Sequence, residues 1–127
     1  MVGLVLVSHS EDIARGLAEL AAQMAGPELR IEAAGGLPDG GLGTDDDRVR
    51  DGIRRADSGD GVVVIGDLGS AILTVRHVLE RSFNGRVILA DAPLVEGAVS
   101  AAVIASTGAD VKQVANAAEE ARNASKL

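Results

Sequence analysis

The run of apolar residues at the start of the chain, between Val2 and Val7, constrains the fold more than any other feature. It reads VGLVLV, so it is short, rich in β-branched side chains and free of polar residues. Such a run is typical of a strand buried on both faces of a parallel sheet. A second run of this kind, VVVI, occupies residues 62–65. We therefore expect two central parallel strands covered by helices.

Strand-like and helix-like segments alternate along the rest of the chain. Two weaker strands are predicted at Leu29–Ala33 and Arg86–Ala90, and both carry charged residues that suit outer positions. With right-handed crossovers, the strand order 2-1-3-4 places the apolar strands inside and the charged strands outside. The sequence predicts one domain over residues 1–127, an α/β fold with three layers, a four-stranded parallel sheet and helices on both faces.

Each predicted helix has an apolar face that we expect to pack on the sheet. Ser10 and Asp110 have the character of N-caps, Thr44 to Asp47 form a capping segment, and Pro93 is well placed to begin a helix. The residues expected to point inward are Ile13, Leu17, Leu20, Ala21 and Met24, then Val49, Ile53 and Ala56, then Ile72, Leu73, Val75, Val78 and Leu79, then Leu94, Ala98, Ala101, Ala102 and Ile104, and finally Val111, Val114, Ala115 and Ala118.

Composition excludes several classes of function. The net charge of −7 argues against nucleic acid or an anionic membrane as a partner. Because there is no cysteine, thiol catalysis, disulfides and cysteine zinc sites are excluded. Neither a GxGxxG after the first strand nor a GxxxxGK is present, so dinucleotide binding and P-loop hydrolysis are unsupported. The first apolar run is too short for a signal peptide or a membrane span, and we expect a cytoplasmic protein.

Two polar side chains follow the two central strands at the point where each strand ends. His9 comes after the first strand, and Asp67 comes after the third. The carboxyl ends of parallel strands meet at one edge of the sheet, where the reversal of strand order opens a crevice. The predicted topology therefore places the histidine beside a carboxylate.

A histidine held in this way is suited to nucleophilic catalysis. A carboxylate that accepts a hydrogen bond from one ring nitrogen leaves the lone pair of the other nitrogen pointing outward. The helix predicted to begin at Ser10 offers free N–H groups and a positive dipole end, which favour a phosphoryl group. Gly43, Thr44, Gly69 and Ser70 are further candidates for donating hydrogen bonds to that group or for facing a partner.

Plainer interpretations of the same residues remain open. His9 could be an ordinary polar residue at a strand end, and Asp67 could simply cap the helix that follows it. The acidic run Asp45–Asp47 resembles a metal site, but consecutive acids at a helix start usually complement the dipole, so we predict a structural role and no metal. His77 lies in the middle of a predicted helix, and we treat it as an ordinary side chain.

Five separated motifs carry a resemblance to a known family. They are VLVSHS at residues 5–10, Gly43-Thr44-Asp45, DSGDG at 57–61, GDLGSA at 66–71 and DAPLVEGA at 91–98. Together they resemble the mannose-type enzyme IIA family of the bacterial phosphotransferase system, and within it the DhaM phosphocarrier subunits of dihydroxyacetone kinases. The resemblance covers nearly the whole chain. It implies that His9 is phosphorylated, that Asp67 orients its ring, and that the protein is a homodimer.

The resemblance also implies a relay of phosphoryl groups. Phosphoenolpyruvate would supply the group through enzyme I and HPr to His9, and His9 would pass it to ADP in the DhaL kinase subunit. The ATP formed there phosphorylates dihydroxyacetone held by DhaK, so no cofactor is expected on this chain. Some relatives carry HPr-like and enzyme I-like domains after this unit, and we expect those proteins in trans. Mannose-class relatives also have a final antiparallel strand, whereas residues 107–127 here have a helical pattern.

Two alternative functions follow from the same reasoning. A mannose-class sugar carrier would use His9 in the same way, but would pass the phosphoryl group to an enzyme IIB. A receiver-like regulatory domain would need acidic residues after the first strand and a lysine near the site. In this chain Ser8-His9-Ser10 follows the first strand, where a receiver domain would have acidic residues. Both lysines, Lys112 and Lys126, lie in the last predicted helix and not near the site.

Overall fold

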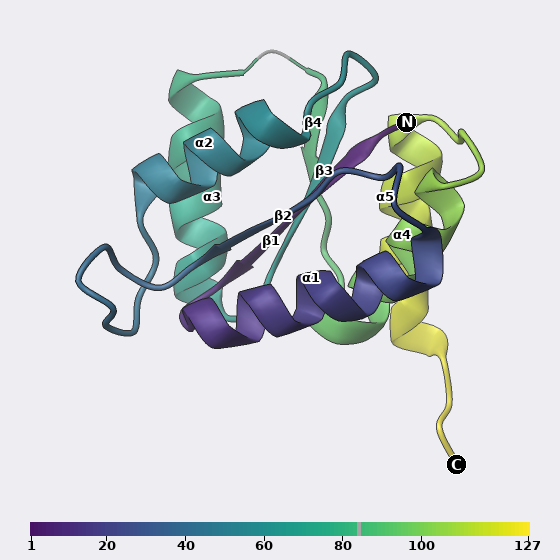
Figure 1. Cartoon of the computed structure of the whole chain (residues 1–127), viewed down its shortest axis with the longest axis horizontal. Helices are drawn as coiled ribbons and strands as arrows, with labels where there is room; N and C mark the ends of the chain where they lie inside the picture. Colours follow the sequence, from purple (N-terminus) through teal and green to yellow (C-terminus); the bar gives the residue numbers. More distant parts are fainter. Residues whose placement is uncertain (84) are drawn as a thin grey trace.

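The computed structural model describes residues 1–83 and 85–127 of the chain. Within them, strands and helices alternate as predicted, and Figure 1 shows their arrangement. In chain order the elements are β1 (Gly3–Ser8), α1 (Glu11–Ala25), β2 (Ile31–Gly35), α2 (Asp46–Ala56), β3 (Val62–Gly66), α3 (Gly69–Arg81), β4 (Val87–Leu89), α4 (Leu94–Ala105), α5 (Val111–Glu120) and the 3-10 helix η1 (Ala121–Asn123).

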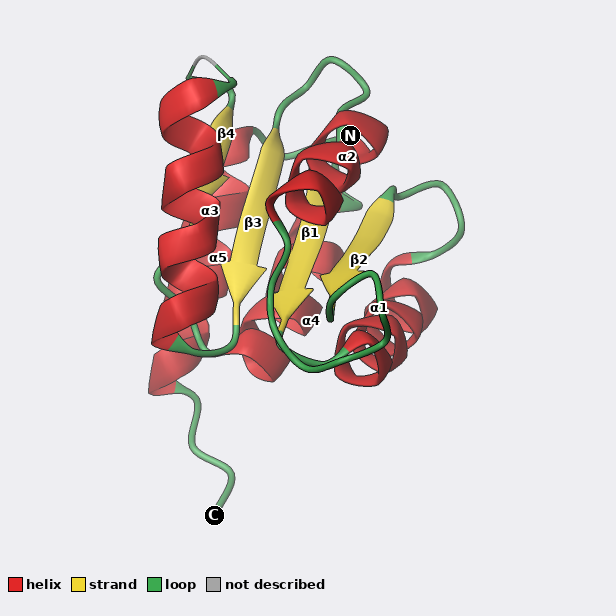
Figure 2. Ribbon diagram, turned by 90° about the vertical axis from the view of Figure 1, so that its left-hand side faces the viewer, coloured by secondary structure: helices red, strands yellow, loops and turns green. Residues whose placement is uncertain are grey.

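The four strands form one parallel sheet in the order β2-β1-β3-β4, which confirms the predicted order (Figure 2). Two apolar clusters cover its faces. One joins the sheet to α1, α4 and α5, and the other joins it to α2 and α3. Every residue of β1 and β3 is buried, so these strands form the centre of the core. β2 begins two residues later than expected, and Leu29 is buried just ahead of it.

Local capping signals in the sequence determine where the helices begin. The Ser10 hydroxyl accepts a hydrogen bond from the Ile13 N–H at 3.3 Å, which makes it the N-cap of α1. Asp45 caps α2, and Asp110 forms a capping box with Gln113 at the start of α5. Each of these side chains satisfies an N–H group that the helix itself leaves without a partner.

The prediction for the buried face of α1 is partly wrong. Ile13, Leu20 and Met24 are exposed, whereas Ala14, Leu17 and Ala21 are buried. The helix is rotated so that its alanines face the sheet, which allows a close approach. A Cβ atom added to Gly35 would lie only 2.8 Å from the Ala14 methyl group. Leu73 of α3 is also exposed, contrary to expectation, because Ala71, Val75 and Val78 form the inner face of that helix.

Gly3 permits the close packing of β1 against the end of α2, and its substitution is expected to destabilise the fold. A Cβ atom at this position would lie 2.0 Å from the Ala56 carbonyl oxygen. Gly3→Ala should therefore lower the free energy of unfolding by about 2 kcal/mol or more. Gly16→Ala is the control, since nothing lies within 4 Å of a Cβ atom there, and alanine in a helix interior should stabilise by up to about 1 kcal/mol. Urea titration followed by circular dichroism measures both; equal stability of the two variants would contradict the packing argument.

Candidate functional site

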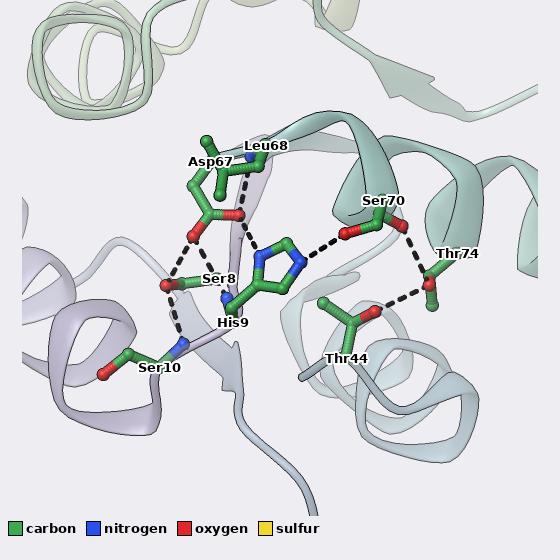
Figure 3. Close-up of polar contacts among 8 residues, drawn as sticks. All are labelled: Ser8, His9, Ser10, Thr44, Asp67, Leu68, Ser70 and Thr74. Atoms are coloured by element: carbon green, nitrogen blue, oxygen red, sulfur yellow. Dashed lines mark hydrogen bonds and ion pairs between the residues drawn. The ribbon is translucent and has the colours of Figure 1, made fainter. Parts of the chain in front are cut away.

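His9 and Asp67 lie at the carboxyl ends of the two central strands. Val7 of β1 is paired with Gly66 of β3, and the Asp67 N–H donates to the Val7 carbonyl at 3.1 Å. His9 is therefore held between the end of β1 and the start of α1, with Asp67 directly after the adjoining strand β3. Figure 3 shows the imidazole ring pointing between Asp67 and the first turn of α3.

The Asp67 carboxylate binds both the ring and the backbone of His9. The ring Nδ1 lies 2.9 Å from Asp67 Oδ1, and the His9 N–H donates to Oδ2 at 3.0 Å. The Ser8 hydroxyl donates to Oδ2 at 2.8 Å, and the Leu68 N–H donates to Oδ1 at 2.7 Å. Because an ionised carboxylate can only accept, we assign the proton to Nδ1 and the free lone pair to Nε2.

The position of Asp67 bears on whether it merely caps a helix. The N-cap of α3 is Leu68, and the helix begins at Gly69 without a side-chain cap. Three of the four hydrogen bonds to the carboxylate come from Ser8 and His9, at the end of the neighbouring strand β1. The arrangement thus fits an orienting role toward the histidine better than a capping role.

The surroundings of Asp67 keep its carboxyl group ionised. Partial burial alone would raise the pKa, but the hydrogen bonds from the His9 N–H, the Ser8 hydroxyl, the His9 ring and the Leu68 N–H outweigh it. The pKa of Asp67 is consequently lower than its ordinary value. A charged carboxylate accepts the Nδ1 proton and so favours the tautomer whose Nε2 lone pair is free.

The lowered pKa of Asp67 predicts a dependence of stability on pH. In the unfolded chain this carboxyl group takes up its proton at about pH 4, whereas in the folded chain it does so at a lower pH. Its contribution to stability is therefore present above about pH 4 and is lost as the pH falls through the folded pKa. We expect the difference in unfolding free energy between the wild type and Asp67→Asn to narrow between about pH 6 and about pH 3. Urea titrations at both pH values measure this difference, and a constant difference would contradict the assignment.

Ser70 in the first turn of α3 reaches the other ring nitrogen. Its hydroxyl is hydrogen-bonded to His9 Nε2, and since Nε2 carries no proton, the hydroxyl is the donor. The His9 side chain is one-quarter exposed, so Nε2 is accessible from solution at a shallow surface. A cavity of about 600 Å³ lies on the far side of Asp67, between α3 and β4, and His9 does not line it.

The Gly-rich loop before α2 packs against the backbone of His9. The Gly43 N–H donates to the His9 carbonyl oxygen at 2.8 Å, which places the loop beside the histidine. The Thr44 hydroxyl is bonded to Thr74 Oγ1 at 2.7 Å, and within the described residues it has no hydrogen bond to the ring. Of the predicted site residues, Asp67 and Ser70 contact the His9 ring, Ser10 and Gly43 adjoin its backbone, Thr44 is bonded elsewhere, and Gly69 begins the helix that carries Ser70.

Sequence reasoning missed two residues of this network. Ser8 is fully buried, donates to Asp67, and accepts a hydrogen bond from the Ser10 N–H at 3.0 Å. A polar residue at the end of an otherwise apolar strand was the available signal. Thr74 lies one turn after Ser70 and links it to Thr44. Nothing in the local sequence pattern distinguishes Thr74 from an ordinary helix residue.

The acidic run at the start of α2 has structural partners. Asp45 caps the helix, Asp46 Oδ2 lies 2.7 Å from Nδ1 of His77, and Asp47 pairs with Arg50 at 2.9 Å. His77 and Asp46 therefore form a second histidine–aspartate pair, about half exposed and between α2 and α3. Among the residues placed in the structure, no three His, Asp or Glu side chains are grouped as metal ligands would be.

Comparison with known proteins assigns the family. The EIIA-man family model, described as the PTS system fructose IIA component, matches residues 3–115. This chain belongs to the EIIA-man family. Within the family it belongs with the DhaM proteins, since it is 40% identical over 106 residues to the phosphoryl donor subunit DhaM of dihydroxyacetone kinase 2 from Listeria innocua, covering 81% of this chain and 85% of that protein.

The relatives of this EIIA-man chain differ in length. The DhaM phosphotransferase subunit of Lactococcus lactis is 35% identical over 88% of this chain and 89% of its own length. DhaM of Escherichia coli is 40% identical over 90% of this chain, which matches only 25% of that longer protein. The crystal structure of EF1359, described as a protein of unknown function, superposes with a TM-score of 0.84 and 37% identity, covering 100% of this chain and 98% of that one.

Membrane insertion by a helix finds no support in the described part of this EIIA-man chain. None of its helices combines the length and the apolar character needed to cross a bilayer.

Proposed function

We propose that this protein is a phosphohistidine carrier that accepts a phosphoryl group on His9 and transfers it to a kinase subunit. The proposal rests on the hydrogen bonding of the His9 imidazole ring. Nδ1 is hydrogen-bonded to an ionised carboxylate at 2.9 Å, which leaves Nε2 as the nucleophile at an accessible surface. The family supports the same function, because it belongs to the phosphotransferase system.

The first transfer exchanges one P–N bond for another. The lone pair of His9 Nε2 attacks the phosphorus of a donor phosphohistidine, the Nε2–P bond forms, and the donor's P–N bond breaks, so that its electron pair returns to the donor imidazole. The Nδ1 proton stays on the ring, and Asp67 compensates the positive charge that develops there. The Ser70 hydroxyl loses its acceptor when Nε2 is phosphorylated, and is placed to donate to a phosphoryl oxygen instead.

The second transfer returns the ring to its starting state. A terminal oxygen of ADP attacks the phosphorus, the Nε2–P bond breaks, and ATP forms in the partner subunit. We propose HPr as the donor and DhaL, with bound ADP, as the acceptor, so that the ATP formed serves dihydroxyacetone phosphorylation. The relatives named as phosphoryl donor subunits of dihydroxyacetone kinases support this pathway. No cofactor on this chain, no nucleic acid and no membrane partner is needed for either step.

Two further properties belong to the proposal. We propose a cytoplasmic location, because phosphoenolpyruvate and ADP are consumed there. We also propose a homodimer, on the strength of the family resemblance, and native mass measurement of the purified chain tests it. We also propose that Ser10, Gly43, Thr44 and Gly69 face a partner protein around His9. The Ser10 N–H, the Gly43 N–H and the Thr44 hydroxyl are already bonded within the domain, so they would shape this surface and not donate to the phosphoryl group.

The experiment follows the phosphoryl group by intact mass, which suits a chain without tryptophan or tyrosine. The protein is incubated with phosphoenolpyruvate, enzyme I and HPr, and then with either ADP-loaded DhaL or a mannose-class enzyme IIB. Gain of one phosphoryl group and its loss only to DhaL is the expected result. Transfer of the phosphoryl group only to enzyme IIB would favour a sugar carrier. The description of the family as a fructose IIA component is consistent with that alternative. No gain of mass would overturn the carrier function altogether.

A further inference from the structure

A hydrogen bond between two threonines ties the Gly-rich loop to the helix beside His9. Thr44 Oγ1 and Thr74 Oγ1 are 2.7 Å apart, and Figure 3 shows them next to Ser70, on the side of the ring away from Asp67. Thr44 lies at the end of the loop and Thr74 lies in α3, so the bond joins segments 30 residues apart in the chain. Within the described residues, neither hydroxyl is hydrogen-bonded to the imidazole, so phosphoryl chemistry alone does not account for the pair.

The loop needs such ties because glycines make it costly to order. Between β2 and α2 it contains four glycines, of which Gly36, Gly40 and Gly43 have φ values of 71°, 89° and 148°. Glycine loses more conformational entropy on ordering than any other residue. The bonds within the loop, such as the Leu37 N–H to the Gly41 carbonyl at 2.9 Å, shape it but do not attach it to the domain.

Hydrogen bonds attach both ends of this loop to the rest of the site. The Gly36 N–H donates to the Ser8 carbonyl at 3.2 Å and anchors the beginning of the loop. At its end, the Gly43 N–H donates to the His9 carbonyl, and the adjacent Thr44 binds Thr74. Without the threonine bond, the end of the loop would keep one of these two hydrogen bonds to the site, the one from the Gly43 N–H to the His9 carbonyl. The cap of α2 by Asp45 would follow it in the chain.

The hydrogen-bond partners of Thr74 determine which of the two threonine hydroxyls is the donor. Thr74 Oγ1 donates to the Ser70 carbonyl at 3.1 Å, so its oxygen must accept the proton of Thr44. The bonds therefore run from Thr44 through Thr74 to the backbone of Ser70, whose hydroxyl reaches Nε2 of His9. One side chain thus contacts both the loop that holds the backbone of His9 and the residue that contacts its reactive nitrogen.

We infer that Thr74 is a positioning residue, which ties the end of the loop at Thr44 to α3 and keeps Gly43 and Ser70 in place around His9. Its effect on phosphoryl transfer rests on the function proposed above, whereas its effect on the loop does not. A single neutral hydrogen bond changes such an equilibrium by about tenfold or less, which is the size of effect to expect.

The experiment removes each hydroxyl without changing the shape of the side chain. The variants are Thr44→Val, Thr74→Val and their combination, with Thr74→Ser as the conservative variant. Thr107→Val is the control, because the Thr107 hydroxyl, in the turn after α4, also donates to a backbone carbonyl, that of Ile104, and within the described residues it has no hydroxyl partner. The measurements are amide hydrogen exchange across residues 36–44 and the rate at which phospho-HPr phosphorylates His9.

We expect both valine variants to speed exchange in the loop, with the rest of the domain unchanged, and to slow phosphorylation by about two- to tenfold. The combined variant should behave like either single one, because the two hydroxyls act as one unit. Thr74→Ser should retain most of the wild-type behaviour, and Thr107→Val should retain all of it.

Several results would overturn the inference. These are unchanged exchange in both valine variants, additive effects in the combined variant, or a Thr74→Ser variant as impaired as Thr74→Val. If Thr74→Val fails to fold, Thr44→Val decides the question alone. A wild-type protein that takes no phosphoryl group would refute the proposed function, and the exchange measurement would then still decide whether Thr74 holds the loop.

Discussion

His9→Ala is expected to abolish the gain of a phosphoryl group from phospho-HPr and to leave the domain folded. The loss should be complete, because among the described residues only His9 presents a nucleophilic nitrogen at this site. Folding should survive, since the backbone bonds from the His9 N–H to Asp67 and from the Gly43 N–H to the His9 carbonyl do not need the imidazole. Intact mass after incubation with the donor measures the first effect, and circular dichroism measures the second.

The matched control for this substitution is His77→Ala. His77 is also within hydrogen-bond distance of an aspartate, with 2.7 Å between its Nδ1 and Asp46 Oδ2, but it lies between α2 and α3, away from the strand ends. Phosphorylation of the control variant should equal that of the wild type. If His77→Ala abolished phosphorylation and His9→Ala did not, the assignment of the site would be wrong.

Asp67→Asn should slow phosphoryl transfer by up to about 10⁴-fold, the loss known for a catalytic histidine held in the wrong tautomer. Asn has one acceptor oxygen, whereas the two oxygens of Asp67 together accept four hydrogen bonds. If that oxygen serves Ser8 and the His9 N–H, the amide group faces Nδ1. The ring proton then moves to Nε2, which is no longer a nucleophile.

The measurement for Asp67→Asn is the single-turnover rate of phosphorylation, alongside its unfolding free energy. Asp46→Asn is the control, because it alters the other histidine–aspartate pair without touching the site. The control should keep the wild-type rate. An unchanged rate in Asp67→Asn would reduce Asp67 to a structural residue of the β3–α3 turn.

Most of the fold was predictable from patterns that act locally. The apolar runs at residues 2–7 and 62–65 determine which strands are central, because only side chains of that kind tolerate burial on both faces. Ser10, Asp45 and Asp110 determine where three helices begin, since each needs only the next turn of the chain to act. Which face of α1 is buried was less predictable, because Ile13 and Ala14 are both apolar and only the approach of the helix to the sheet decides between them.

The proximity of His9 and Asp67 was also predictable, for a topological reason. Both follow central strands, and parallel strands bring their carboxyl ends to one edge whatever the details of packing. The structure added the finer contacts. Asp67 holds the backbone of His9 as well as its ring, and Ser8 completes the binding of the carboxylate.

The sequence alone therefore determined the architecture, the strand order and the two residues at the centre of the site. Only the tertiary structure placed Ser70 at Nε2 and Thr44 at Thr74. The physical reason is the range of the interactions. Periodicity and capping depend on neighbours along the chain, whereas these contacts depend on the position of α3 and of a glycine-rich loop relative to β1, which is set by the packing of the whole core.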